Sequence, residues 1–139
     1  MEEVSLHVET EINSTESQEK VEEAVRNIFG DVNLQVKPLR KASLLVGEGK
    51  GKESLTRLCD LLRREHIRSA ARAVFLEGME KKAVRFCFNK QVAVAGHISF
   101  SKETAESPLG PIRVKIECRD PRELVEWLAS TRITQKQGW

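Results

Sequence analysis

Two periodicities of apolar residues alternate along this chain of 139 residues, and no other feature limits its fold as strongly. A period of two, apolar then polar, predicts half-buried strands, and it covers residues 4–12, 83–89 and 112–118. A helical spacing of apolar residues predicts amphipathic helices, and it covers residues 17–29, 53–65, 67–78 and 121–128. Strands interspersed with helices predict a two-layer α+β sandwich, in which the helices pack on one face of a mostly antiparallel mixed sheet.

Weaker signals predict further strands. Leu34 and Val36 form a short alternation that ends near Pro38, because proline has no N–H to donate to a neighbouring strand. Apolar runs over 42–46 and 92–100 predict two more. The face of the sheet that the helices leave uncovered would then carry Ser5, His7, Arg85, Arg113 and Lys115.

Polar segments with glycine and proline separate these elements. Residues 47–52 predict a flexible loop that leads into a helix, and residues 89–91 predict a turn or bulge. The segment 101–111 contains two prolines and a glycine, which predicts a second loop. We expect one α+β domain over residues 1–130 and a frayed tail over 131–139.

Charge is sorted by position along the chain. Residues 1–36 carry 2 basic and 9 acidic side chains, a net charge of −7, whereas residues 37–90 carry 14 basic and 6 acidic, a net charge of +8. Residues 91–139 are nearly neutral, so the total of +2 conceals a basic middle. A one-sided field of this size attracts polyanions, and we therefore expect a protein that binds nucleic acid, RNA in particular.

The glycine-lysine segment is the most suggestive local motif. The free N–H groups of a glycine-rich turn that opens a helix can hold a phosphate, and Lys50 and Lys52 add positive charge. The segment lacks the spacing of a nucleotide-binding P-loop, because only three residues separate Gly47 from Gly51 and Glu53 follows Lys52. A contact to a backbone phosphate and a plain mobile loop both remain open.

The two central helices carry arginines that share helical faces. Arg57 and Arg64 lie seven residues apart, and Arg68 and Arg72 lie four apart. The alternative to a phosphate-binding surface is a solvated helix surface, partly neutralised by nearby carboxylates. Those carboxylates would be Asp60, Glu65 and Glu77. The full set of predicted phosphate contacts is Lys37, Arg40, Lys41, Lys50, Lys52, Arg57, Arg64, Arg68 and Arg72.

Other classes of function lack their motifs. The chain has no tyrosine, and its phenylalanines fall on predicted core faces, which argues against base stacking and favours recognition of structured RNA through its phosphates. No nucleophile, base or carboxylate pair stands at a catalytic spacing, and the cysteines show no metal-ligand spacing. We therefore expect no enzyme activity, cofactor, metal site or small-molecule substrate.

The cysteines favour a reducing compartment. Cys59, Cys87 and Cys118 are odd in number and far apart, so they cannot close a disulfide framework. No apolar run reaches the length needed to cross a membrane, and the start of the chain lacks the basic residues of a signal peptide. We expect a cytoplasmic protein that does not contact a membrane.

Five short motifs occur in order along the chain. They are Leu61-Leu62-Arg63-Arg64, Ile67 with Ala70-Ala71-Arg72, Phe88-Asn89-Lys90-Gln91, Pro108-Leu109-Gly110-Pro111-Ile112 and Glu123-Leu124-Val125-Glu126-Trp127-Leu128. In this order and spacing they resemble an uncharacterised archaeal family of predicted RNA-binding proteins. That family is similar to a predicted exosome subunit and has a fold like the ribosomal protein that binds 5S rRNA. The resemblance extends from about Val4 to Ala129.

The resemblance implies a single α+β domain with a role in RNA processing or translation, and it brings no catalytic residues. It also implies a candidate polar site at Asn89, Lys90 and Gln91, and a structural turn at Gly110-Pro111. Where the family has a proline before the threonine of its first helix, this chain has Ser14.

A protein-interaction or homodimerisation module is the alternative function. The acidic first helix of one copy would meet the basic middle of another, and an exposed sheet edge would favour self-association. The sequence pI of about 8.5 is below the value above ~9 of a dedicated nucleic-acid domain, which leaves this alternative open.

Overall fold

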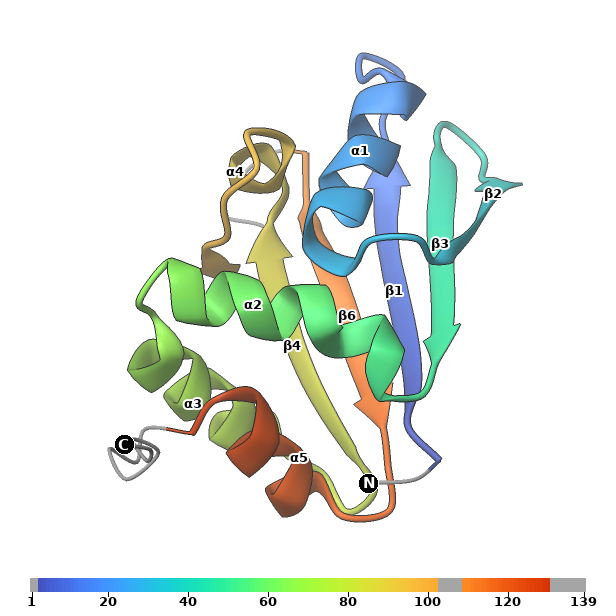
Figure 1. The fold of residues 1–139 in the computed structure, drawn as a ribbon. Helices are drawn as coiled ribbons and strands as arrows, with labels where there is room; N and C mark the ends of the chain where they lie inside the picture. Colours follow the sequence, from blue (N-terminus) through green and yellow to red (C-terminus); the bar gives the residue numbers. More distant parts are fainter. Residues whose placement is uncertain (1–2, 103–108, 131–139) are drawn as a thin grey trace.

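A computed structural model of the chain describes residues 3–102 and 109–130 (Figure 1). Its elements follow one another as β1 (Ser5–Ile12), α1 (Gln18–Phe29), β2 (Asn33–Pro38), β3 (Ser43–Lys50), the 3-10 helix η1 (Lys52–Leu55), α2 (Thr56–Arg64), α3 (Arg68–Glu77), β4 (Ala83–Asn89), α4 (Lys90–Val94), β5 (Phe100–Ser101), β6 (Pro111–Glu117) and α5 (Pro121–Leu128). The predicted tail and most of the predicted loop before β6 lie outside the described residues.

The strands form a single sheet in the order β2-β3-β1-β6-β4-β5. Every neighbouring pair in it is antiparallel, and the first and last long strands, β1 and β6, lie side by side at its centre. The helices α1, α2, α3 and α5 cover one face of this sheet (Figure 1). The predicted α+β sandwich, with helices on one face of an antiparallel sheet, is confirmed.

The core fills the space between the sheet and the helix layer. Phe75 of α3, Phe86 and Phe88 of β4, and Phe100 of β5 form one cluster of rings, with centroids 4.7 to 6.2 Å apart. The alternate side chains of the strands lie on the opposite, uncovered face, where Arg85 is exposed and Arg113 is half-buried, as predicted.

The predicted flexible loop over residues 47–52 is wrong. Residues 47–50 continue β3, because they pair in register with β1 as far as Lys50 opposite Ser5. Glycine suits this strand because neighbours approach closely: a Cβ on Gly47 would lie 2.9 Å from Leu34 Cδ2, and one on Gly49 would lie 2.7 Å from Ser54 Cβ. Only Gly51, with φ of 78°, turns the chain into η1.

The predicted strand over residues 92–100 is also wrong. Asn89 caps a short helix, α4, by accepting a hydrogen bond from the backbone N–H of Val92 at 3.0 Å. Asn27 of α1 donates its side-chain amide to the Ala93 carbonyl at 2.9 Å, which holds α4 against α1. A short apolar run does not distinguish a strand from a buried helical turn, and here the cap decides. Only Phe100–Ser101 pair as β5.

Candidate nucleic-acid interface

The predicted basic residues lie at separate places on the molecule. Lys37, Arg40 and Lys41 are exposed on the β2–β3 hairpin, at one end of the sheet. Lys37 lies opposite Leu44, and Leu44 and Lys50 are six positions apart on β3, which corresponds to roughly 20 Å along the strand. The hairpin cations therefore do not share a site with Lys50.

Three of the predicted residues meet in one cleft. Lys50 from the end of β3 and Arg57 and Arg64 from α2 line a cavity of about 610 Å³, between α2 and the segment that follows α1. Arg57 is held in place because its Nε donates to the Asn27 carbonyl at 2.8 Å. Four carboxylates also line this α2 cleft: Asp31, Glu48, Glu53 and Asp60.

Basic residues continue past the end of α2. Arg63, His66 and Arg68 line a shallow hollow of about 210 Å³ where α2 gives way to α3. Lys52 lies at the other end of α2, where its ammonium stands 5.1 Å from the centre of the Trp127 ring of α5. We call Lys50, Lys52, Arg57, Arg64 and Arg68 the α2 basic surface.

Carboxylates lie near the α2 basic surface, but those of the described residues form no ion pair with its cations. Over residues 3–102 and 109–130, no carboxylate forms an ion pair with Lys50, Lys52, Arg57, Arg64 or Arg68. Two carboxylates expected to neutralise the surface have other partners, since Asp60 pairs with Arg63 at 3.4 Å and Glu65 with His97 at 3.0 Å. The His97 contact also lowers the pKa of Glu65.

Arg72 departs from the predicted set. Its Nη2 donates to Glu126 of α5, and its side chain is largely buried between the two helices. This contact joins α3 to α5, so Arg72 serves the packing of the helix layer and does not extend the α2 basic surface.

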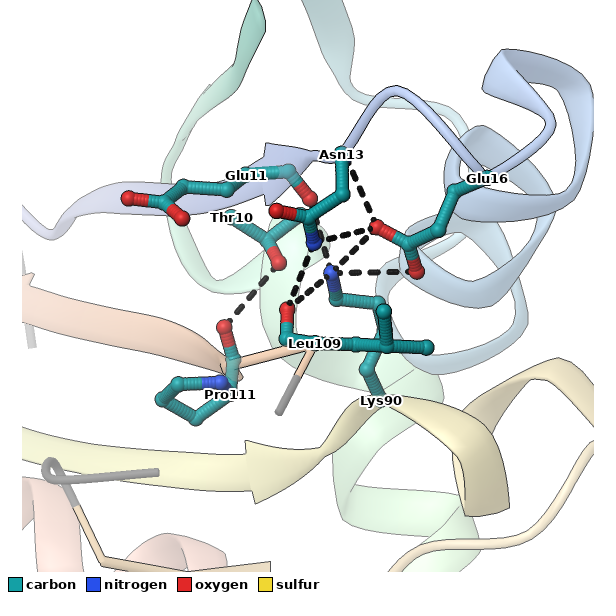
Figure 2. Close-up of polar contacts among 7 residues, drawn as sticks. All are labelled: Thr10, Glu11, Asn13, Glu16, Lys90, Leu109 and Pro111. Carbon is teal, nitrogen blue, oxygen red and sulfur yellow. Dashed lines mark hydrogen bonds and ion pairs between the residues drawn. The ribbon is translucent and has the colours of Figure 1, made fainter. Parts of the chain in front are cut away.

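Lys90 departs from the predicted site more strongly, because only 2% of its side chain is exposed. Its ammonium donates to the Glu11 and Leu109 carbonyls, at 2.7 Å each, and to both carboxylate oxygens of Glu16, at 3.0 and 3.3 Å (Figure 2). No N–H of the Lys90 ammonium is left to face solvent, so within the predicted polar site Lys90 stabilises the fold and is not open to a phosphate. Asn89 is occupied as the α4 cap, and only Gln91 of the three is exposed.

The partner of Lys90 could not be found from the sequence. Glu16 lies 74 residues away, and Asn13 completes the cluster by donating to Glu16 Oε1 at 2.9 Å and to the Leu109 carbonyl at 3.1 Å (Figure 2). Burial raises the pKa of Glu16, but the hydrogen bonds from Asn13 and Lys90 outweigh it and hold the pKa below its ordinary value. The cluster ties the β1–α1 turn to α4 and to the chain entering β6.

The other reactive side chains are engaged in packing. Burial raises the pKa of the Cys59 and Cys118 thiols, which keeps them protonated near neutral pH. Within the described ranges, no three His, Cys, Asp or Glu side chains gather where they could hold a metal ion. None of the helices described there is long and apolar enough to span a membrane.

The chain matches a known protein family over most of its length. A family model described as RNA binding matches residues 5–118, most of the chain. The chain belongs to this RNA-binding family. The match includes all five residues of the α2 basic surface.

Members of the UPF0201 group are similar to the chain in sequence and in structure. The UPF0201 protein of Sulfurisphaera tokodaii is 39% identical over 121 residues, covering 87% of this chain and 83% of the relative. That of Aeropyrum pernix is 38% identical, covering 94% and 87%. The crystal structure of the UPF0201 protein of Methanococcus jannaschii superposes with a TM-score of 0.80 at 29% identity, covering 90% of this chain and 98% of that one.

Proposed function

We propose that this member of the RNA-binding family is a non-catalytic protein that binds structured RNA through its phosphates, with a role in RNA processing or translation. In this proposal, the α2 basic surface is the part of the protein that contacts the RNA phosphates. Its five cations come from β3, η1, α2 and α3: Lys50, Arg57 and Arg64 line the α2 cleft, and Lys52 and Arg68 lie just before and just after α2.

The observation that carries the proposal is the convergence of Lys50, Arg57 and Arg64 on one cleft without ion-pair partners among the described residues. A cation that is already paired with a carboxylate gains little from a phosphate, whereas an unpaired cation gains most. An arginine guanidinium group can donate two parallel hydrogen bonds to the phosphate oxygens. The four carboxylates of the α2 cleft offset its three cations, so the phosphates are expected at the exposed rim of the cleft and along α2 towards Lys52 and Arg68, which lie beyond the cleft.

The decisive experiment is fluorescence anisotropy with a labelled RNA hairpin, titrated at several salt concentrations. The affinity of the wild-type protein should fall steeply with salt, because each phosphate contact releases counterions. The triple variant Lys50→Ala/Arg57→Ala/Arg64→Ala should bind more weakly, and the slope of log affinity against log salt should become shallower by about 2–3, at ~0.7–0.9 per contact.

A matched control removes the same charge elsewhere. Lys20, Lys81 and Arg122 are exposed on α1, on the α3–β4 turn and on α5. The variant Lys20→Ala/Lys81→Ala/Arg122→Ala should keep nearly the wild-type slope. Equal losses in the two triple variants would mean that net charge alone drives binding and would refute the surface. Absence of RNA binding by the wild-type protein at low salt would refute the function.

A further inference from the structure

A second cleft, of about 600 Å³, opens at the opposite edge of the sheet. It lies where β5 ends and the C-terminal end of α3 approaches β4. The sheet edge is covered on either side of it, because β5 pairs with Cys87 and Phe88 and the Arg85 N–H donates to the Gly78 carbonyl at 2.9 Å. We call it the β4 cleft.

The floor of the β4 cleft is apolar and aromatic. Phe86 and Phe100 line it together with Val74 and Val114. Their two rings belong to the phenylalanine cluster of the core, which holds them in a fixed orientation, with centroids 6.2 Å apart. A rigid ring that is only half-buried, as Phe100 is, offers a face or edge on which a flat ligand can stack.

The rim of the β4 cleft is basic. Arg113 of β6, Arg85 of β4 and Lys102 all line it, and Glu77 is the acidic residue among the lining. Arg85 is paired with Glu80 at 2.8 Å. Arg113 and Lys102 have no ion pair with any residue of the described ranges, but Arg113 lies opposite Cys87 on the uncovered face, whereas Phe100 lies opposite Phe88 on the helix-covered face. Lys102, two residues after Phe100, is therefore the cation available to a ligand on the Phe100 ring.

The combination of a ring floor and a cationic rim fits one nucleotide. A base that is unstacked from an RNA helix needs an apolar and aromatic surface, and its phosphate needs a cation nearby. The cavity is within the ~300–1,000 Å³ usual for sites of this kind. The β4 cleft is also within reach of the α2 basic surface. Arg68 and Val74 are six positions apart on α3, which is a rise of about 9 Å.

Resting on the proposed RNA-binding function, we propose that the β4 cleft captures a single unpaired base of the bound RNA, with the base against Phe100 and the adjoining phosphate on Lys102. The α2 basic surface would then supply affinity for any RNA helix. The β4 cleft would supply preference for a helix with a bulged or terminal unpaired nucleotide, a selectivity that phosphate contacts alone do not provide.

Two RNA hairpins that differ by one bulged 2-aminopurine nucleotide test this inference by anisotropy. The wild-type protein should bind the bulged hairpin at least about fivefold more tightly, the lower end of what stacking of one base contributes. The fluorescence of 2-aminopurine should change on binding, as the base enters the cleft. Phe100→Leu keeps apolar bulk but removes the ring, and Lys102→Gln removes the charge, and each should bring the preference close to one.

The α2 triple variant is the control, because it should weaken binding of both hairpins and leave their ratio unchanged. Thermal unfolding of each variant establishes that it is folded, and Lys102→Gln serves if Phe100→Leu is not. Equal wild-type affinity for the two hairpins would overturn the β4 cleft while leaving RNA binding intact. A preference that survives both cleft variants would also overturn it. Failure of the wild-type protein to bind either hairpin would overturn the proposed function itself.

Discussion

The ammonium of Lys90 lies 3.0 Å from a carboxylate oxygen of Glu16, in a site where 2% and 11% of the two side chains are exposed. The pair joins the β1–α1 turn to the start of α4, and Lys90 also donates to the Leu109 carbonyl, in the backbone before β6 (Figure 2). Three segments far apart in sequence are therefore held by one cation.

Replacing this cation should destabilise the fold. Lys90→Met removes the charge but keeps most of the apolar bulk. It leaves the buried Glu16 carboxylate without its cation and removes the hydrogen bonds to the Glu11 and Leu109 carbonyls, although Asn13 still donates to Glu16 and Leu109. Breaking one half of a buried pair costs about 3–5 kcal/mol, and we expect the free energy of unfolding, measured in urea, to fall by that amount. The neighbouring variant Gln91→Met, at an exposed position, should change it by less than about 0.5 kcal/mol. Equal effects of the two variants would contradict a structural role for Lys90.

The same pair should make stability depend on pH. The pKa of Glu16 is lower in the folded protein than the ~4.3 of an unfolded glutamate, so its ionised form favours the folded state. Its contribution is complete above that unfolded value and is lost as the pH falls through the folded pKa. Wild-type protein should therefore lose stability between about pH 5 and pH 3. The variant Glu16→Gln should lose less over that range, and parallel pH profiles in urea unfolding would exclude the effect.

Gly78, between α3 and β4, should tolerate no side chain. A Cβ at this position would lie 1.9 Å from the carbonyl oxygen of Arg85, which is backbone and cannot swing aside. Gly78→Ala should therefore force the α3–β4 contact apart and cost about 1–3 kcal/mol of unfolding free energy. Ser69→Ala, at an exposed position on the same helix, should cost less than about 0.5 kcal/mol. A Gly78→Ala protein as stable as the wild type would show that the contact relaxes freely.

The sequence was most informative where one periodicity persists for two turns of helix or more, or for several strand residues. The alternation from Val4 to Ile12 and the helical spacing from Ser17 to Phe29 recur within one residue as β1 and α1. In both segments, the backbone geometry of the element and the burial of one of its faces require apolar residues at the same positions. The sign and position of the basic middle were equally readable, because charge belongs to each residue regardless of fold.

Short or mixed segments were decided by neighbours that are remote in sequence. Gly47 and Gly49 predict a loop by composition, but they extend β3 because both pair with β1 and Gly47 also pairs with Leu34 of β2. The run after Asn89 is apolar enough for a strand, yet its cap and its contact with α1 make it helical.

Periodicity and charge in the sequence alone determined the two-layer class, most of the long elements and the presence of a basic middle. Only the tertiary structure decided which cations are available, and it divided residues that look alike: Lys90 is buried against Glu16 and Arg72 is paired with Glu126, whereas Lys50, Arg57 and Arg64 share one cleft. The β4 cleft likewise exists only because α3, β4, β5 and β6, which are separated by other segments in the sequence, pack together there. Periodicity is a property of neighbouring residues, but exposure and pairing depend on which distant segments pack together.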